Sequence, residues 1–284
     1  MRDEKRRRQF DSSWTPPSAF CLPPSAFFLV LAIWLGAVAV WNRSTRGESG
    51  GWHDTRTFGP LVCRADFSLE SIDPVLRQLA QLQIDLNDRL GVRPAAEPIE
   101  LYLFRQEWTY RNTLSRHFPN VPYRRALYVK TGGRGMVFAY WSREFEIDLR
   151  HECTHALLHA ALPVVPLWLD EGLAEYFEIA PDERASGSPY LSGVRWMARF
   201  GITPRLEKLE KKIDVGQMGG SEYRDSWAWV HFMLHGPQAA REELTGYLGD
   251  IQNHCPPGLL SQRLQQRLPD CDRQFGSHFK SWTR

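Results

Sequence analysis

Two histidines and a glutamate stand close together near the middle of the chain, in the order His151-Glu152-Cys153-Thr154-His155. Residues four apart on a helix share a face, so the two imidazoles can reach one metal ion. Glu152, beside them, can take a proton from a water bound to that ion. Neutral imidazole suits zinc, and a catalytic zinc usually has three protein ligands and one water. The spacing therefore indicates a zinc centre that activates water.

This arrangement requires a helix, and the flanking residues predict one. Apolar side chains recur at helical spacing around the two histidines, at Leu149, Cys153, Ala156, Leu157 and Ala160. Asp148 is placed as an N-cap, and Pro163 should end the helix. The alternative is that the histidines only form a hydrogen-bonded polar face and hold no metal.

A third protein ligand has to come from another part of the chain. A metzincin would need glycine at position 158 and histidine at position 161, where this chain has Leu158 and Ala161, so that class is excluded. His159 is expected to be an ordinary helix residue, with a ligand role as the alternative. The better source is the helix expected after Pro166, in which Glu171 can return a carboxylate to the metal.

The same second helix contains further residues suited to a metal site. Gly172 has no side chain, which would let the two helix backbones approach closely. Glu175 lies one turn beyond Glu171, and Glu178 lies two turns beyond it. Either carboxylate could accept the outer N–H of a ligand histidine and so fix its tautomer.

The H-E-x-x-H pattern is followed at residues 168–178 by W-L-x-E-G-x-A-E-Y-x-E. This combination resembles the gluzincin metallopeptidases, and among them the peptidase MA-like domains of bacterial proteins. The resemblance implies that His151, His155 and Glu171 bind one Zn²⁺, that Glu152 is the catalytic base, and that the substrate is a peptide or protein.

The resemblance covers residues 57–235 and is sharp only at 149–178. Fifteen residues separate His155 from Glu171, fewer than in the aminopeptidase branch of the family. No G-x-M-E-N segment of the aminopeptidase type lies upstream. N-terminal exopeptidase activity is therefore not carried over to this chain.

A β-hairpin is expected just before the metal-binding helix, because residues 126–130 and 136–141 flank a glycine-rich turn. In gluzincins, an edge strand beside the metal pairs with extended substrate. By that resemblance, the second strand of the hairpin is expected to bind substrate by strand addition, with an ordinary sheet strand as the alternative. Its candidate residues are Met136, Val137, Phe138, Ala139 and Tyr140.

A Tyr-x-x-Ser-Trp-Ala segment at residues 223–228 is also similar to the peptidase MA-like pattern. In gluzincins, a downstream tyrosine or histidine donates a hydrogen bond to the developing oxyanion. Tyr223 is the candidate for this role, and packing in the core is the alternative. His231 is a weaker candidate, because a lone histidine on an apolar helix is usually structural.

Composition bounds the remaining possibilities. The chain has 284 residues, of which 43% are hydrophobic and 24% charged, which is typical of a globular protein. A formal charge of +2, without a basic stripe in the body, argues against a nucleic-acid partner. None of the five cysteines forms a C-x-x-C pair, so a cysteine zinc site is not expected. Cys255 and Cys271 could form a disulfide if the domain lies outside the cytoplasm.

The N-terminus predicts membrane attachment. Mostly basic residues at 2–8 precede an apolar run of sixteen residues at 26–41, which as a helix would span about 24 Å. We expect an uncleaved signal anchor with a cytoplasmic N-terminus and an extracytoplasmic catalytic body. The alternative is signal cleavage near Ala39 and secretion.

These observations together predict an α+β chain with a zincin-like metallopeptidase fold. A small mixed sheet should precede the H-E-x-x-H helix, and the second half should be mostly helical. The expected divisions are a cytoplasmic segment (1–25), a transmembrane helix (26–41), a linker (42–56), the peptidase MA-like domain (57–240) and a helical extension (241–284).

The predicted function is that of a membrane-anchored zinc metallopeptidase. One alternative is a zinc-binding or interaction module of the cell envelope that keeps the fold without catalysis. A third hypothesis is a structural envelope protein whose histidines merely pack.

Overall fold

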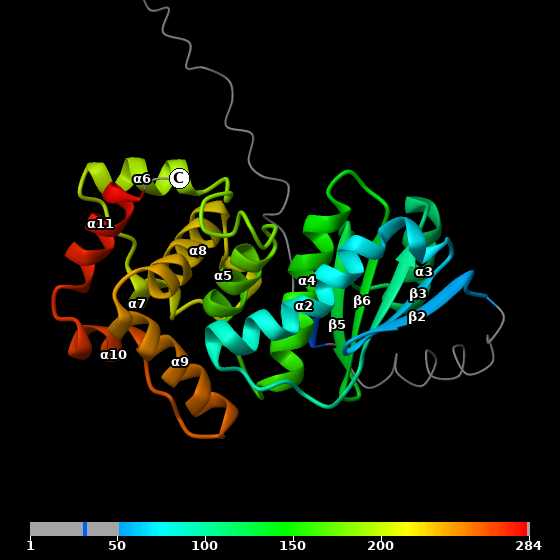
Figure 1. The fold of residues 1–284 in the computed structure, drawn as a ribbon, viewed down its shortest axis with the longest axis horizontal. Helices are drawn as coiled ribbons and strands as arrows, with labels where there is room; N and C mark the ends of the chain where they lie inside the picture. Colours follow the sequence, from blue (N-terminus) through cyan, green and yellow to red (C-terminus); the bar gives the residue numbers. More distant parts are fainter. Residues whose placement is uncertain (1–30, 33–50, 283–284) are drawn as a thin grey trace, which may run out of the picture.

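The computed structural model describes residues 31–32 and 51–282, which form a half built on a β-sheet and a half built of helices (Figure 1). The strands are β1 (Leu31–Ala32), β2 (Asp54–Phe58), β3 (Leu61–Ala65), β4 (Ile99–Phe104), β5 (Ala126–Thr131) and β6 (Arg134–Tyr140). The helices among and directly after these strands are α2 (Asp73–Leu90), α3 (Glu107–His117), α4 (Phe145–Ala161) and α5 (Leu167–Phe177). The later helices are α6 (Leu191–Arg199), α7 (Leu206–Leu209), α8 (Gly220–His235), α9 (Gln238–Gln252), α10 (Leu260–Arg267) and α11 (Cys271–Ser281). Short 3₁₀ turns lie at Leu69–Ile72 and Val215–Gln217.

The sheet is mixed, with the strand order β1-β5-β6-β4-β3-β2. Strands β3, β4 and β6 run parallel, while β2 and β5 are antiparallel to their neighbours β3 and β6. Helices α2 and α4 pack on one face of this sheet, and α3 packs on the other. The predicted α+β class, with a small mixed sheet before the H-E-x-x-H helix and helices after it, is confirmed.

Helix α2 shows how closely local patterning can determine an element. Its apolar residues at helical spacing are all in the core: Val75, Leu76, Leu79, Leu82, Leu86 and Leu90. The helix starts at Asp73, with Pro74 in its first turn, where a missing N–H costs nothing. It ends at Gly91, which adopts the left-handed conformation with φ 70°.

Strands β2 and β3 form an antiparallel hairpin, because the chain turns at Gly59 with φ 55°. The start of another element differs from the sequence prediction. Helix α4 begins at Phe145 and not after an Asp148 cap. Asp148 is buried inside the helix instead, and both of its carboxylate oxygens accept hydrogen bonds from Arg125, at 2.8 and 3.1 Å.

Helix α5 joins the two halves of the molecule, packing on α4 on one side and on α8 on the other. A Cβ atom at Gly172 would lie only 2.7 Å from the backbone oxygen of Ser226 in α8. The missing side chain was expected to serve contact with the H-E-x-x-H helix. That prediction was wrong, because the close backbone approach is made with α8.

Within residues 31–32 and 51–282, no helix is long and apolar enough to cross a bilayer. The predicted transmembrane run at 26–41 lies outside the described residues except for Leu31 and Ala32. These two residues form β1, which pairs in parallel with Val129 and Lys130 of β5, and so they are not helical here. The anchor and the localisation stay predictions. The possible disulfide is not formed, since Cys255 and Cys271 are both free thiols.

Candidate metal centre

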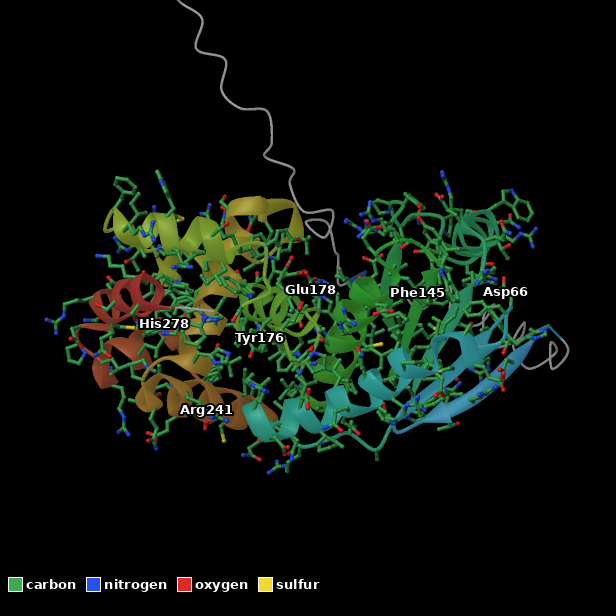
Figure 2. All side chains as sticks on the ribbon, turned by 45° about the horizontal axis from the view of Figure 1, so that its top comes forward. Asp66, Phe145, Tyr176, Glu178, Arg241 and His278 are labelled. Carbon is green, nitrogen blue, oxygen red and sulfur yellow. The ribbon has the colours of Figure 1, made fainter. Side chains whose placement is uncertain are left out.

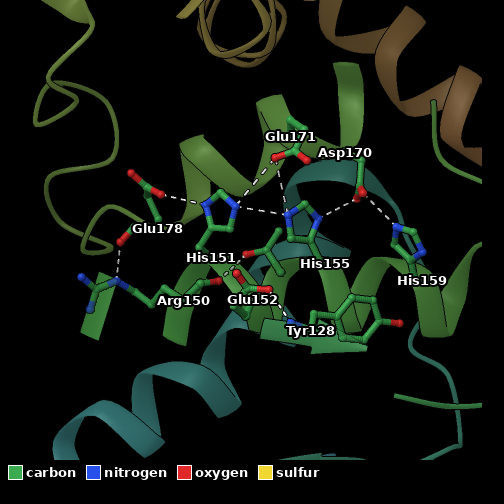
Figure 3. Close-up of polar contacts among 10 residues, drawn as sticks. Tyr128, Arg150, His151, Glu152, His155, His159, Asp170, Glu171 and Glu178 are labelled. Atoms are coloured by element: carbon green, nitrogen blue, oxygen red, sulfur yellow. Dashed lines mark hydrogen bonds and ion pairs between the residues drawn. The ribbon is translucent and has the colours of Figure 1, made fainter. Parts of the chain in front are cut away.

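Two helices bring three potential metal ligands to one point (Figure 3). Helix α4 supplies His151 and His155, whose Nε2 atoms are 3.2 Å apart. Helix α5 supplies Glu171, whose Oε2 atom lies 3.8 Å from His151 Nε2 and 3.7 Å from His155 Nε2. In a tetrahedral site with metal bonds of about 2.0–2.1 Å, ligand atoms are roughly 3.3–3.4 Å apart. The three side chains therefore fit one zinc ion with only small adjustments.

The outer nitrogen of each histidine faces a carboxylate. His151 Nδ1 lies 2.8 Å from Oε2 of Glu178, and His155 Nδ1 lies 3.1 Å from Oδ1 of Asp170. A carboxylate only accepts hydrogen bonds, so in a metal-bound centre each Nδ1 would carry the single ring proton of a neutral imidazole. The lone pairs of both Nε2 atoms then face the Glu171 carboxylate and each other. Carboxylates on the outer nitrogens are the usual support of histidines that bind zinc.

The centre is electrostatically unsatisfied without a cation. His151, His155 and Glu171 are buried, and neither oxygen of Glu171 has a hydrogen-bond partner within the described part of the chain. Burial raises the pKa of Glu171 well above its usual value and lowers that of His151. Burial also acts to lower the pKa of His155, but Asp170 and Glu171 outweigh it and raise that pKa to about 10. The cluster thus attracts one positive charge, as a proton or as a metal ion.

Glu152 lies on the same helix and is 2% exposed. Its Oε2 atom accepts a hydrogen bond of 2.7 Å from the backbone N–H of Tyr128 in β5. Its Oε1 atom is buried and has no hydrogen-bond partner among the described residues. Burial raises the pKa of Glu152 to about 7, with His155 and the Tyr128 N–H acting in the opposite direction. A carboxyl group with this pKa can both take and release a proton near neutral pH.

The two candidate supporting carboxylates, Glu175 in α5 and Glu178 directly after it, have different positions. Glu178 is the one that contacts a ligand histidine, through His151 Nδ1. Glu175 is buried beside it, and carboxylate oxygens of both residues lie within 4.8 Å of a His151 ring nitrogen. Burial, followed by the neighbouring Glu178, raises the pKa of Glu175 well above its usual value.

Sequence reasoning missed the part played by Asp170. This buried carboxylate lies between His155 and His159, with 2.9 Å from its Oδ2 atom to His159 Nε2. His159, predicted to be an ordinary helix residue, is therefore a hydrogen-bonding partner of Asp170. The sequence contained a signal for this contact. His155 and His159 are one helical turn apart and share a face, and Asp170 directly precedes the candidate ligand Glu171.

The predicted oxyanion donor, Tyr223, is buried near the start of α8, the helix that packs on α5. Its place in the reaction stays a prediction. His231 lies in the helical half, where its ring nitrogens are 3.1 Å from His278 Nε2 and 3.0 Å from the Ala185 carbonyl oxygen. These contacts favour the structural alternative for His231.

The expected substrate strand is placed differently from the prediction. Met136, Val137, Phe138, Ala139 and Tyr140 all belong to β6, which pairs with β4 on one side and with β5 on the other. An interior strand has no free backbone groups, so strand addition at β6 is excluded and that prediction was wrong. The strand that borders Glu152 is β5, through the Tyr128 N–H.

No family model matches the chain, and no curated protein matches it. Among solved structures, the chain is similar to the crystal structure of an M1 zinc metallopeptidase from Deinococcus radiodurans, with 15% sequence identity and a TM-score of 0.41. The similarity covers 82% of this chain and 52% of that one, so the chain spans about half the length of the M1 enzyme. A likeness this distant does not assign an activity, which must be argued from the site itself.

Proposed function

We propose that the protein is a zinc-dependent metallopeptidase. The observation that carries this proposal is the convergence of His151 Nε2, His155 Nε2 and the Glu171 carboxylate, at separations of 3.2 to 3.8 Å, beside the buried carboxyl group of Glu152. The donor set of two imidazoles and one carboxylate suits zinc and leaves a fourth position for water. The ion proposed is one Zn²⁺ per chain.

The proposed reaction is hydrolysis of a peptide bond. Zinc would lower the pKa of its bound water and polarise the scissile carbonyl group. Glu152, with its pKa near 7, takes a proton from the attacking water and transfers it to the nitrogen of the leaving amine. Glu178 and Asp170 hold the imidazoles of His151 and His155 in the tautomer that turns each Nε2 toward the centre. Tyr223 is proposed to donate a hydrogen bond to the oxyanion.

The substrate proposed is an extended peptide segment, and the outer edge of β5 is its binding strand. The Tyr128 N–H lies at that edge and contacts Glu152, so a peptide added there would pass beside the catalytic carboxyl group. In the structure, β1 pairs with this edge at Val129 and Lys130. A peptide substrate would take the place that β1 occupies.

A zinc-binding envelope module without catalysis is the second candidate. His151 and His155, held by the carboxylates of Glu178 and Asp170, would serve either function equally well. Glu152 favours the enzyme, because a purely structural metal site does not need a buried proton acceptor next to the ligands. Attachment through residues 26–41, with the catalytic body outside the cytoplasm, remains part of the proposal on sequence grounds alone.

The decisive experiment uses the full chain purified in detergent. We expect one zinc per chain and chelator-sensitive cleavage of unfolded casein. Glu152→Gln should keep the zinc and lose the cleavage, whereas Glu146→Gln, an exposed position on the same helix, should keep both. Zinc binding with no cleavage by the wild-type chain would favour the non-catalytic module, and absence of bound zinc would exclude both candidates.

A further inference from the structure

Helix α6 presents apolar side chains on two opposite sides. Leu191, Val194 and Ala198 are buried on the inner side, where the helix packs on α11 and α8. Trp196 and Phe200 point the other way and are 57% and 66% exposed. Their rings lie 4.7 Å apart, so they form one outward aromatic pair. The exposed side chains of Trp196 and Phe200 do not belong to the packed core of the chain.

Apolar and basic side chains lie beside this pair, of which Arg199 is exposed and Arg195 half-buried. Ile202, just beyond the helix, is 47% exposed, and its backbone N–H bonds to the Met197 carbonyl oxygen at 3.0 Å, which holds it close to α6. Arg195 and Arg199 lie on the helix, and neither forms an ion pair within the described part of the chain. We call Trp196, Phe200, Ile202, Arg195 and Arg199 the α6 patch.

The charge around the α6 patch differs from that of the whole chain. The chain has 35 basic and 33 acidic residues, close to balance. Residues 191–213 contain six basic and only two acidic side chains. The acidic ones are both engaged, Glu207 with Arg205 and Glu210 with Ser261, and among the basic ones Lys212 is also paired, with Glu222. The surface is therefore locally positive and suits an anionic partner.

We propose that the α6 patch docks on the surface of a bilayer that contains anionic phospholipid. Tryptophan and phenylalanine enter the headgroup layer, and arginine stems lie along apolar surface while their guanidinium groups reach phosphate. The helix lies at the outer rim of the helical half, away from the sheet (Figures 1 and 2), where a flat surface can reach it. The proposal is independent of the zinc chemistry.

The size of the patch favours a lipid surface over a protein partner. Three large apolar side chains that are each about half exposed offer on the order of 300 Å². A stable protein interface takes about 800 Å² from each partner. A small aromatic and basic patch is instead a usual second attachment signal, one that adds to another membrane contact.

The test uses the full chain reconstituted in vesicles of phosphatidylcholine, with or without phosphatidylglycerol. A photoreactive benzoylphenylalanine replaces Phe200 in one variant. In the control it replaces Trp108 in α3, which is 74% exposed and lies in the sheet half of the molecule. Mass spectrometry then identifies what each probe has bound.

We expect lipid adducts at position 200, only weak ones at position 108, and a dependence on phosphatidylglycerol. Replacing Arg195 and Arg199 by glutamine should lower the adduct yield at position 200, with a loss of about fivefold in surface affinity for each arginine. Equal yields at positions 200 and 108, or a yield independent of phosphatidylglycerol, would overturn the proposal. Adducts between two protein chains at position 200 would also overturn it and assign the patch to self-association.

Discussion

Asp170 lies on the outer side of His155, away from the proposed metal position, with 3.1 Å from its Oδ1 atom to the Nδ1 atom of the ring, while its other oxygen contacts His159. This contact turns the Nε2 atom of His155 toward the proposed zinc. It also places a buried negative charge beside the ligand, which strengthens the ligand's hold on a cation.

Replacing Asp170 by asparagine should therefore weaken zinc binding by roughly 10- to 100-fold. The amide keeps the shape of the side chain but not its charge, and it can no longer accept from both imidazoles. Competition with a chelator of known affinity measures the change. His159→Gln should have a smaller effect, because it leaves the Asp170–His155 contact in place, and a larger effect of His159→Gln would assign His159 to the metal itself.

Gly172→Ala should destabilise the fold by about 1–3 kcal/mol. The added Cβ would lie 2.7 Å from the Ser226 backbone oxygen, so α5 and α8 would have to separate. Gly193→Ala in α6 is the matched control, because a Cβ there meets no atom within 4 Å. Urea denaturation should show the control unchanged or slightly more stable, since alanine is the better helix former. Equal midpoints for the two variants would contradict the close packing of α5 on α8.

His231 should make the stability of the fold depend on pH below neutrality. The Ala185 carbonyl oxygen only accepts, so His231 Nε2 carries the proton and His231 Nδ1 accepts from His278 Nε2. Burial lowers the pKa of His231 to about 3, well below its value of about 6.5 in an unfolded chain. The unfolded state then binds more protons, so this contribution is complete above pH about 6.5 and is lost as the pH falls toward 3.

Between these limits, we expect His231 to cost about 1.4 kcal/mol of unfolding free energy for each unit of pH decrease. The measurement compares denaturation of the wild-type chain and the His231→Phe variant between pH 6.5 and 4. The variant should have the shallower dependence on pH. Parallel curves would show that His231 titrates equally in both states and is not held neutral by burial.

The two histidines of α4 that we propose as metal ligands could be located in the sequence because their signal is local. His151 and His155 are four residues apart, and their helix follows from the apolar positions around them. Glu171 was inferred from the resemblance and from the expected return of the next helix, and the structure places its carboxylate beside both imidazoles. The buried face of α2 likewise follows from apolar residues at helical spacing within a single segment.

What could not be predicted depends on pairing between distant segments. The place of β6 inside the sheet follows from its pairing with β4, whose partner residues lie 36 positions earlier in the chain, and no local pattern encodes strand order. Asp148 has the chemistry of a helix cap, but in the fold it is buried and forms an ion pair with the half-buried Arg125. Gly172 was expected to allow close approach to the H-E-x-x-H helix, but the backbone that it meets is at Ser226, far along the sequence.

X-ray absorption at the zinc edge of the purified full chain tests the central claim most directly. The account predicts one zinc per chain, bound by two imidazole nitrogens and by oxygen at about 2.0–2.2 Å, with no sulfur ligand. The Glu171→Gln variant should lose most of its zinc. Sulfur at about 2.3 Å, or zinc retained in full by that variant, would contradict the proposed centre of His151, His155 and Glu171.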